Sequence, residues 1–405
     1  MTQPDANPLA RTRADFPLLQ RCIDGRPITH LDSASTAPKP RCVIDAVTGF
    51  YLEHTANVHR GVHVLSEEST ELFERARQEV ASFINAAPSE IVFTRNSTEG
   101  INLVASGLGL REDDEVIVTA LEHHSNYMPW RVHAHAVPVG LLPDGVPRYE
   151  EIGGRLSPKT RLVALAQVSN TLGAIAPVAG WIAAAHAQGI PALVDASQSA
   201  SHLPIDVRAM DCDFLVMSGH KLLGPSGIGV LYGKRERLEA LAPYQVGGGM
   251  VKLHEEEHFV LQDVPWRFEA GTPNIEGAIG LGAAVSYLRN LGMEAVQRHS
   301  VKLGRRLVTR LRAIKGIEIL ADSVPDGQRI GLATFIVHAP GLGQENIARL
   351  LCDRHQILVS GGYHCAHMLH HRLKLEGTVR ASTHVFNTEA DIDRLAEALT
   401  EIVEV

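Results

Sequence analysis

Three groups of polar residues follow apolar runs that are typical of buried strands, and their side chains can do chemistry. Ser97 and Thr98 follow the first run, Asp195 ends a second run with Gln198 three residues later, and Lys221 follows a third. A lysine placed after a buried strand and near a carboxylate suits an amine nucleophile, because burial lowers the lysine pKa and frees the amine. Ser97, Thr98 and the first amides of the following helix would make an anion site.

Each of these residues also has a simpler structural interpretation. Ser97 or Thr98 can cap a helix, Asp195 can do the same, and Lys221 can lie at the surface. Taken together, however, they match the needs of pyridoxal phosphate: a lysine to condense with its aldehyde, a carboxylate for its pyridine nitrogen and donors for its phosphate. The combination therefore predicts a pyridoxal phosphate site.

The elements that must position these residues form an alternating α/β pattern. Helices are predicted over 98–110 and over 179–188, the latter ending at Gly189. The short apolar runs predict a mostly parallel sheet that is covered on both faces. The predicted strands are Glu90–Thr94, Glu115–Thr119, Arg161–Gln167, Pro191–Asp195, Asp213–Met217 and Ile228–Tyr232.

After about residue 275 the pattern changes to that of a smaller α+β domain. We expect one long helical stretch over 276–315 and further helices over 344–355 and from about 388. The expected strands are 317–320, 332–337 and 378–386. The expected organisation is an N-terminal segment (1–25), a large cofactor-binding domain (26–285) and a small C-terminal domain (286–405).

Composition excludes several classes of protein. The chain has 405 residues, 45% hydrophobic and 21% charged, with a formal charge of −8. That is a globular composition of two or three domains, and its acidity argues against nucleic-acid binding. No apolar run approaches the roughly 18 residues of a membrane span, and the first 19 residues lack a signal peptide's apolar core. Five cysteines without paired spacing do not form a disulfide framework, so we expect a soluble cytoplasmic protein with no membrane partner.

Sequence motifs spread from about residue 30 to 390 resemble the class V aminotransferase family, which has the pyridoxal phosphate enzyme fold type I. Within it the chain is most similar to the cysteine desulfurases of the sulfur-mobilisation type and the selenocysteine lyases. The motifs are Leu31-Asp-Ser-Ala-Ser35, Asn57-Val-His-Arg-Gly61, Ser97-Thr-Glu-Gly-Ile-Asn-Leu103, Glu122-His-His-Ser-Asn126, Asp195-x-x-Gln198, Ser218-Gly-His-Lys221-x-x-Gly-Pro-Ser-Gly-x-Gly, Arg267-Phe-Glu-Ala-Gly-Thr-Pro-Asn274, His364-Cys365-Ala and Gly377-Thr-Val-Arg-Ala-Ser382.

The resemblance implies a role for each residue around the cofactor ring. Lys221 would hold the cofactor covalently and then move the substrate's Cα proton. Asp195 would pair with the pyridine nitrogen, and Gln198 and Asn170 would lie near the phenolic oxygen. His123 would stack on the ring and act as an acid or base. Its neighbour His124 is interpreted as a structural residue.

The resemblance also implies a phosphate site shared between two subunits. Ser97, Thr98, Ser218 and His220 would hold the phosphate, and Thr272 would complete the site from the second subunit. Function would then require a homodimer.

Cys365 decides the chemistry that the resemblance implies. As a thiolate it would attack the sulfur of L-cysteine, leaving alanine and an enzyme persulfide. L-Selenocysteine is the alternative substrate. Arg380 would clamp the substrate carboxylate, with Asn170 also binding substrate. A separate sulfur-acceptor protein would then relieve Cys365. The remaining cysteines are interpreted as buried core residues: Cys22, Cys42, Cys212 and Cys352.

The chain departs from the family pattern just before Cys365. Ser360 stands where an arginine is usual, and Tyr363 replaces a histidine. Loss of an arginine contact worth about 1.5–3 kcal/mol points to an altered substrate preference. The histidines at 367, 370 and 371 would share a face if helical, as metal ligands can. The segment is a loop in the family, so we expect solvated histidines and no metal.

The predicted function is that of a cysteine desulfurase that supplies sulfur, as for iron–sulfur cluster assembly. Selenocysteine lyase, C–S lyase or epimerase activity on a related amino acid are the enzymatic alternatives, motivated by Ser360 and Tyr363. A catalytically silent scaffold is the alternative outside enzymes, and the intact Lys221, Asp195 and Gln198 argue against it.

Overall fold

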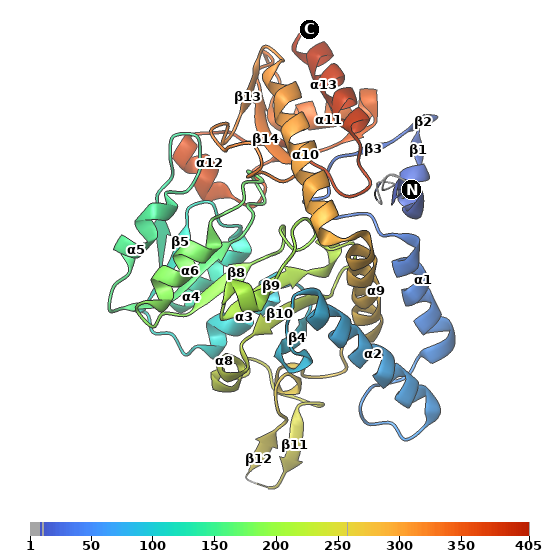
Figure 1. Cartoon of the computed structure of the whole chain (residues 1–405), viewed down its shortest axis with the longest axis vertical. Coiled ribbons are helices and arrows are strands. Elements are labelled where there is room, and N and C mark those ends of the chain that lie inside the picture. The colour runs from blue at the N-terminus through green and yellow to red at the C-terminus, as the bar shows by residue number, and fades with distance from the viewer. Residues whose placement is uncertain (1–8, 10–11, 257, 405) are drawn as a thin grey trace, which may run out of the picture.

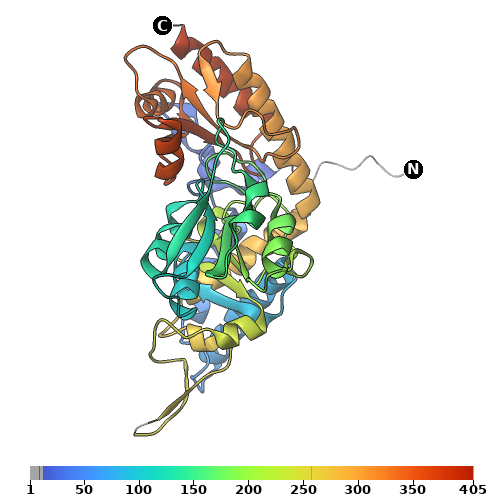
Figure 2. The same ribbon diagram turned by 90° about the vertical axis from the view of Figure 1, so that its left-hand side faces the viewer.

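The computed structural model describes residue 9, residues 12–256 and residues 258–404, and it has a large lobe and a small lobe (Figure 1). The large lobe is built on one seven-stranded sheet, and the small lobe on a four-stranded sheet near the C-terminus. The hairpin β11–β12 projects from the end of the molecule opposite the small lobe in both views (Figure 2).

The seven-stranded sheet is mostly parallel, as the sequence predicts. Strands β5 to β9 pair in parallel, while β10 runs antiparallel to both of its neighbours. Six of its strands lie within one residue of their predicted ranges, whereas the strand over residues 135–139 has no predicted counterpart. In spatial order the strands are β4 (Ile91–Thr94), β10 (Gly229–Gly233), β9 (Phe214–Ser218), β8 (Ala192–Asp195), β7 (Thr160–Ala166), β5 (Glu115–Thr119) and β6 (His135–Val139).

Both faces of this sheet are buried, which explains the unbroken apolar runs of its strands. Successive residues alternate between two cores: Val194 packs into one and Leu193 into the other. Side chains of α2 (Val64–Phe83), α6 (Val178–His186) and α9 (Ile275–Leu291) complete the first core. Side chains of α3 (Ser97–Gly107), α4 (Met128–His133) and α8 (Arg235–Ala240) complete the second.

The expectation of one helical stretch over 276–315 is wrong in detail. Two helices, α9 and α10 (Met293–Arg312), meet at Gly292, whose φ of +80° lies in the left-handed region that favours glycine. The break lets α10 leave the large lobe and pack on the small one. The expected domain boundary between residues 285 and 286 falls inside α9.

The small lobe packs three helices against an antiparallel sheet. The order of its strands is β13 (Ile317–Ile319), β14 (Leu332–Val337), β17 (Thr378–Ser382) and β16 (Ser360–Gly362), and its helices are α10, α11 (Gln344–His355) and α13 (Glu389–Val403). The predicted strand 378–386 is too long, because the chain leaves the sheet after Ser382 and residues 383–386 form no strand.

An early segment of the chain also belongs to this lobe. Strand β3 (Thr29–His30) pairs in parallel with β15 (Ile357–Leu358), and the amide of Ser382 donates to the carbonyl of Leu31 over 2.7 Å. Residues 32–35 therefore enter the space between the lobes beside β16 and β17. The small lobe thus holds the segment that leads into the site.

The remaining helices and strands lie outside the two main sheets. They are α1 (Arg41–Gly49), α5 (Ile152–Arg155), α7 (Val207–Met210), α12 (His367–Leu373), the strand pair β1 (Cys22–Ile23) and β2 (Arg26–Pro27), and the strand pair β11 (Val251–His254) and β12 (Phe259–Leu261). Within the described part of the chain, no helix combines the length and apolarity needed to cross a membrane.

Candidate active site

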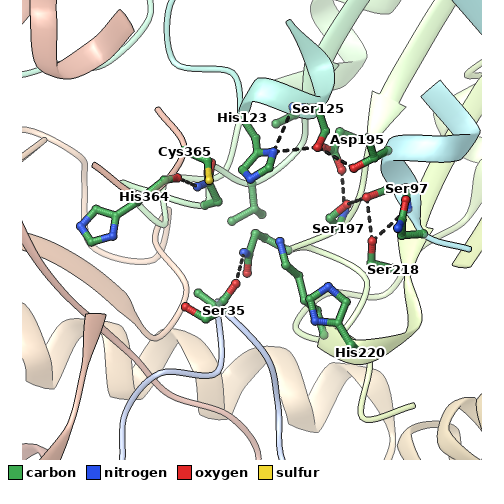
Figure 3. Close-up of a pocket in the computed structure, with 18 of the residues that line it drawn as sticks. Ser35, Ser97, His123, Ser125, Asp195, Ser197, Ser218, His220, His364 and Cys365 are labelled. Atoms are coloured by element: carbon green, nitrogen blue, oxygen red, sulfur yellow. Dashed lines mark hydrogen bonds between the residues drawn. The ribbon is translucent and has the colours of Figure 1, made fainter. Parts of the chain in front are cut away.

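A cavity of about 460 Å³ lies at the carboxyl ends of β8 and β9, where the two lobes meet. Eleven of the twelve site residues predicted from the sequence line it (Figure 3). The large lobe contributes Ser97, Thr98, His123, Asn170, Asp195, Gln198, Ser218, His220 and Lys221, and the small lobe contributes Cys365 and Arg380. The exception is Thr272.

Lys221 stands on a tight turn directly after β9. The turn, Gly219–Lys221, needs a glycine first, because a Cβ on Gly219 would come within 2.8 Å of the Ile228 carbonyl oxygen. Burial lowers the pKa of the Lys221 amine to about 8, against the opposing effect of the nearby Asp195 carboxylate. Lys221 is therefore not a surface lysine, and a large fraction of its amine is neutral near pH 8.

Asp195 and Gln198 are fixed by the turn that follows β8. The Asp195 Oδ1 atom accepts from the Ser197 amide over 2.9 Å, so the carboxylate holds its own turn rather than capping a helix. Gln198 Nε2 donates to the Ala34 carbonyl over 2.9 Å and ties this turn to the early segment of the chain. Both side chains are buried.

Three buried hydroxyls cluster opposite Cys365, at the start of α3 (Figure 3). Ser97 Oγ lies 2.7 Å from Ser218 Oγ and accepts from Ser197 Oγ over 2.9 Å. The N-cap of α3 is Asn96, whose side chain accepts from the Glu99 amide, so the capping interpretation of Ser97 and Thr98 is wrong. The serine hydroxyls and the N-terminus of α3 can thus bind an anion.

His123 belongs to a second hydrogen-bonded cluster near the start of α3, together with two hydroxyl side chains. Its Nδ1 atom lies 3.0 Å from Ser125 Oγ, which lies 2.6 Å from Thr98 Oγ1. Burial, with a further contribution from the Lys221 charge, lowers the pKa of His123 to about 4. The imidazole is therefore neutral at pH 7 and can lie against an aromatic ring or accept a proton.

His220 is a second neutral imidazole at the cavity wall. Burial and the Lys221 charge lower its pKa to about 4. The Nζ atom of Lys39, which does not line the cavity, donates to the His220 carbonyl oxygen over 2.9 Å. A neutral His220 can still donate one ring N–H to a phosphate.

Cys365 reaches the cavity from a constrained segment of the small lobe. Its thiol side is exposed, and both His364 and Cys365 have left-handed backbone angles, φ +50° and +55°. Such angles are uncommon for residues with a Cβ and are retained where surrounding contacts enforce them. Here the His124 amide donates to the Cys365 carbonyl over 3.0 Å, and Asn170 Nδ2 donates to the His364 carbonyl over 2.8 Å.

Arg380 is buried in β17 at the same cavity. Its Nη1 atom donates to the Asn170 carbonyl over 2.9 Å, and its Nη2 atom donates to Ser35 Oγ over 2.7 Å. Its Nε atom has no hydrogen-bond partner among the described residues. Asn170 therefore links both small-lobe residues, Cys365 through the neighbouring His364 and Arg380 directly, to the large lobe.

The histidines after Cys365 differ in exposure: His367 and His371 are exposed, as expected, whereas His370 is buried. Residues 367–373 form the short helix α12, not the expected loop. His367 Nδ1 lies 3.1 Å from His124 Nε2, and the His367 ring stacks on Tyr363 at 4.7 Å, while His370 turns inward to Thr378. Among residues 12–256 and 258–404, no group of three His, Cys, Asp or Glu side chains could hold a metal ion.

The prediction that four cysteines are core residues is mostly wrong. Cys212 is buried, but Cys352 is half-buried, and Cys22 and Cys42 are exposed. Cys22 begins β1 and Cys42 lies in the first turn of α1, each directly after an arginine. All five cysteines are free.

Thr272 lies away from this cavity in the single chain. It lines two smaller cavities, of about 220 and 250 Å³, together with Glu269 and Pro273. The segment is anchored by Glu269, which pairs with the buried Arg77 over 2.7 Å. Nothing in one chain brings Thr272 to Lys221.

Sequence reasoning missed four polar residues of the cavity, namely Ser35, Asn96, Ser125 and Ser197. The last three lie within two residues of a predicted site residue, so their positions in or beside the motifs were a usable signal. Ser360, which the sequence marks as a departure from the family, and His364, in the His-Cys-Ala motif, also line the cavity. Ser35 and Ser360 become neighbours only through the β3–β15 and β16–β17 pairings.

The donor set of the cavity fits pyridoxal phosphate. A buried amine of lowered pKa, a buried carboxylate and clustered hydroxyls at a helix start meet in one space. Their chemistry matches an aldehyde, a pyridine nitrogen and a phosphate, respectively.

The chain was also compared with known proteins. Residues 29–395 match the family model described as Aminotransferase class-V. The cysteine desulfurase of Klebsiella pneumoniae (strain 342) is 43% identical over 404 residues, covering 97% of each chain. A probable cysteine desulfurase of Synechocystis sp. is also 43% identical, covering 96% of this chain and 94% of the relative.

Solved structures give the same result. The apo structure of the cysteine desulfurase from Thermococcus onnurineus NA1 superposes with a TM-score of 0.90 at 36% identity, covering 97% of each chain. The cysteine desulfurase CsdA from Escherichia coli superposes with a TM-score of 0.88 at 37% identity, covering 99% of each chain. The protein belongs to the class V aminotransferase family and has its fold, fold type I.

Proposed function

We propose that the protein is a cysteine desulfurase in which Cys365 takes the sulfur of L-cysteine. Its cofactor is pyridoxal phosphate, the group that the donor set of the cavity fits. The observation that supports this function most strongly is the convergence of Lys221, Arg380 and Cys365 on one cavity from two lobes. The relatives named cysteine desulfurase support the same assignment.

Each part of the cavity has a task in this proposal. Lys221 would hold the cofactor covalently and Asp195 would pair with its pyridine nitrogen. Its phosphate would be held by Ser97, Ser218, Thr98 and His220. Gln198 and Asn170 lie near its phenolic oxygen. When bound, the cofactor withdraws electrons from the substrate's Cα. His123 lies against the ring as a neutral imidazole, because burial keeps its pKa near 4.

The protein residues then act in sequence on L-cysteine. Arg380 binds the substrate carboxylate, and Lys221, once released, takes the Cα proton with its neutral amine. The Cys365 thiolate forms a bond to the substrate sulfur as the substrate's Cβ–S bond breaks. The electron pair of that bond stays with Cβ, which takes a proton and becomes the methyl group, and Lys221 returns a proton to Cα to complete alanine. Cys365 is left as a persulfide.

The wider setting follows from the same chemistry. An exposed Cys365 can pass its outer sulfur to an acceptor protein, for use such as iron–sulfur cluster assembly in the cytoplasm. A homodimer would bring Thr272 of the second copy to the phosphate site, since one chain leaves Thr272 outside the cavity.

A mass measurement tests the function. After incubation with L-cysteine, we expect one added sulfur atom on Cys365 and equimolar alanine. Cys365→Ala should lose both the added sulfur and at least about two decades of alanine release, since the nucleophile is gone. Cys42→Ala, which alters another exposed thiol, should behave as the wild type. Full-rate release of alanine and sulfide by Cys365→Ala would overturn the proposal.

A further inference from the structure

Asp32 lies behind the wall of the cavity and contacts the groups that face the substrate carboxylate. Its Oδ1 atom accepts from Ser35 Oγ over 2.8 Å and from Ser360 Oγ over 2.7 Å. The same oxygen lies 3.5 Å from Arg380 Nη2. Ser35, Ser360 and Arg380 line the cavity, whereas Asp32 does not.

The two serine hydroxyls are already engaged within the protein. Each can donate to Asp32 Oδ1, and the two serine oxygens also lie 3.0 Å apart, where either can be the donor. Their lone pairs are left for Arg380, whose Nη2 atom lies 2.7 Å from Ser35 Oγ and 3.4 Å from Ser360 Oγ. Both hydroxyls therefore bridge a cation and an anion that belong to the protein itself.

The carboxylate of Asp32 already compensates the Arg380 charge. Arg380 is 4% exposed, and an isolated buried guanidinium would be costly, so a nearby anion stabilises it. A substrate carboxylate that binds at Nη2 shares the guanidinium charge and the two serine hydroxyls with Asp32, so that two carboxylates are then near one cation. Asp32 and the substrate carboxylate thus seek the same donors.

We propose that Asp32 is an internal competitor for the carboxylate subsite, and that by holding Arg380, Ser35 and Ser360 it sets how weakly an α-amino acid binds. The inference rests on the proposed function only in taking an α-amino acid as the ligand. Asp32 is a specificity-determining residue in this sense and touches no reacting atom. Removing its charge should tighten binding of ligands that carry a carboxylate and of no others.

The test compares two amines that differ only in the carboxylate. The holoenzyme is titrated with L-alanine and with ethylamine while the cofactor's absorbance band is followed. In Asp32→Asn we expect the dissociation constant of L-alanine to fall about tenfold, because one charged competitor is removed, and that of ethylamine to stay within about twofold. Asp353→Asn, an exposed position on α11, should change neither value.

Other results overturn the proposal. If Asp32→Asn weakens the binding of L-alanine or leaves it unchanged, Asp32 does not compete with the ligand's carboxylate. If both amines change together, Asp32 acts through the cofactor site. Should Asp32→Asn fail to fold, Asp32→Ser removes the same charge in a smaller side chain and is judged by the same ratio. The amine titration needs no turnover, so it is independent of the sulfur measurement on Cys365 that tests the proposed function.

Discussion

At the scale of single residues, the environment decides what each ionisable group can do. Lys221 and His123 sit within one buried cavity, and burial favours the neutral form of both. A neutral amine can attack an aldehyde or take a proton, and a neutral imidazole can pack against a ring. The chemistry of the site therefore begins with desolvation, not with unusual residues.

The Lys221 pKa gives a prediction for cofactor capture. Only the neutral amine reacts, so the rate at which apoprotein binds the cofactor covalently should rise about tenfold per pH unit below a pKa of about 8 and level off above it. Stopped-flow absorbance measures this rate. Lys221→Arg, which stays charged, should not form the bond.

A second lysine provides the control for that pH profile. Burial lowers the pKa of Lys39 to about 8 as well, although Lys39 does not line the cavity. Lys39→Arg should keep the midpoint near pH 8. Loss of the midpoint in this variant would assign the titration to Lys39 and contradict the prediction for Lys221.

At the scale of elements, glycines decide where helices stop. Gly292 separates α9 from α10 at a φ of +80°, and a Cβ there would meet nothing within 4 Å. Glycine is therefore needed at this position for its backbone angle and not because a side chain would clash. That single residue changes the direction of the chain from the large lobe to the small lobe.

Two glycine substitutions should consequently have opposite effects. Gly292→Ala forces a Cβ into the left-handed region and should lower the free energy of unfolding by about 1 kcal/mol. Gly180→Ala, in α6 with ordinary backbone angles and equally open space, should raise it by about 0.5 kcal/mol through helix propensity. Chemical denaturation measures both. Equal effects of the two substitutions would show that backbone angle is not the cause.

At the scale of the whole molecule, a pair of buried histidines lies where the lobes join. The rings of His202 and His384 are 5.0 Å apart, and His202 Nδ1 lies 3.1 Å from Ser300 Oγ in α10. Burial lowers the pKa of His202 to about 4 and that of His384 well below its ordinary value. Both are neutral in the folded protein at pH 6.

These lowered pKa values predict a loss of stability in acid. Below about pH 6.5 the unfolded chain binds protons that the folded chain cannot, so the free energy of unfolding falls as the pH falls towards 4. Between pH 6.5 and 5 His202, with its pKa near 4, should contribute a loss of about 1.5 kcal/mol, and His384 acts in the same direction. Denaturation at several pH values measures this slope. His202→Gln should flatten it, whereas His63→Gln, at an exposed position, should not; an unchanged slope in His202→Gln would contradict the prediction.

The sequence by itself determined the class of fold and most of the site. Short unbroken apolar runs that alternate with helical patterns are typical of strands buried on both faces. The predicted site residues Lys221, Asp195 and Ser97 lie at or just after the ends of such runs. The motifs around them consist of residues close together in the sequence, so their spacing can be recognised without the structure. The same local reasoning failed for Cys22 and Cys42, whose exposure depends on what the rest of the chain leaves uncovered.

Only the tertiary structure decided which distant residues meet. Cys365 and Arg380 reach Lys221 because α9 and α10 turn the small lobe over the sheet, and Asp32 reaches Arg380 because β3 pairs with β15. Such contacts depend on strand pairing and lobe packing between segments far apart in the chain, and side-chain types alone do not encode their distances. The position of Thr272 outside the cavity in the single chain is likewise a tertiary result that its sequence motif does not reveal.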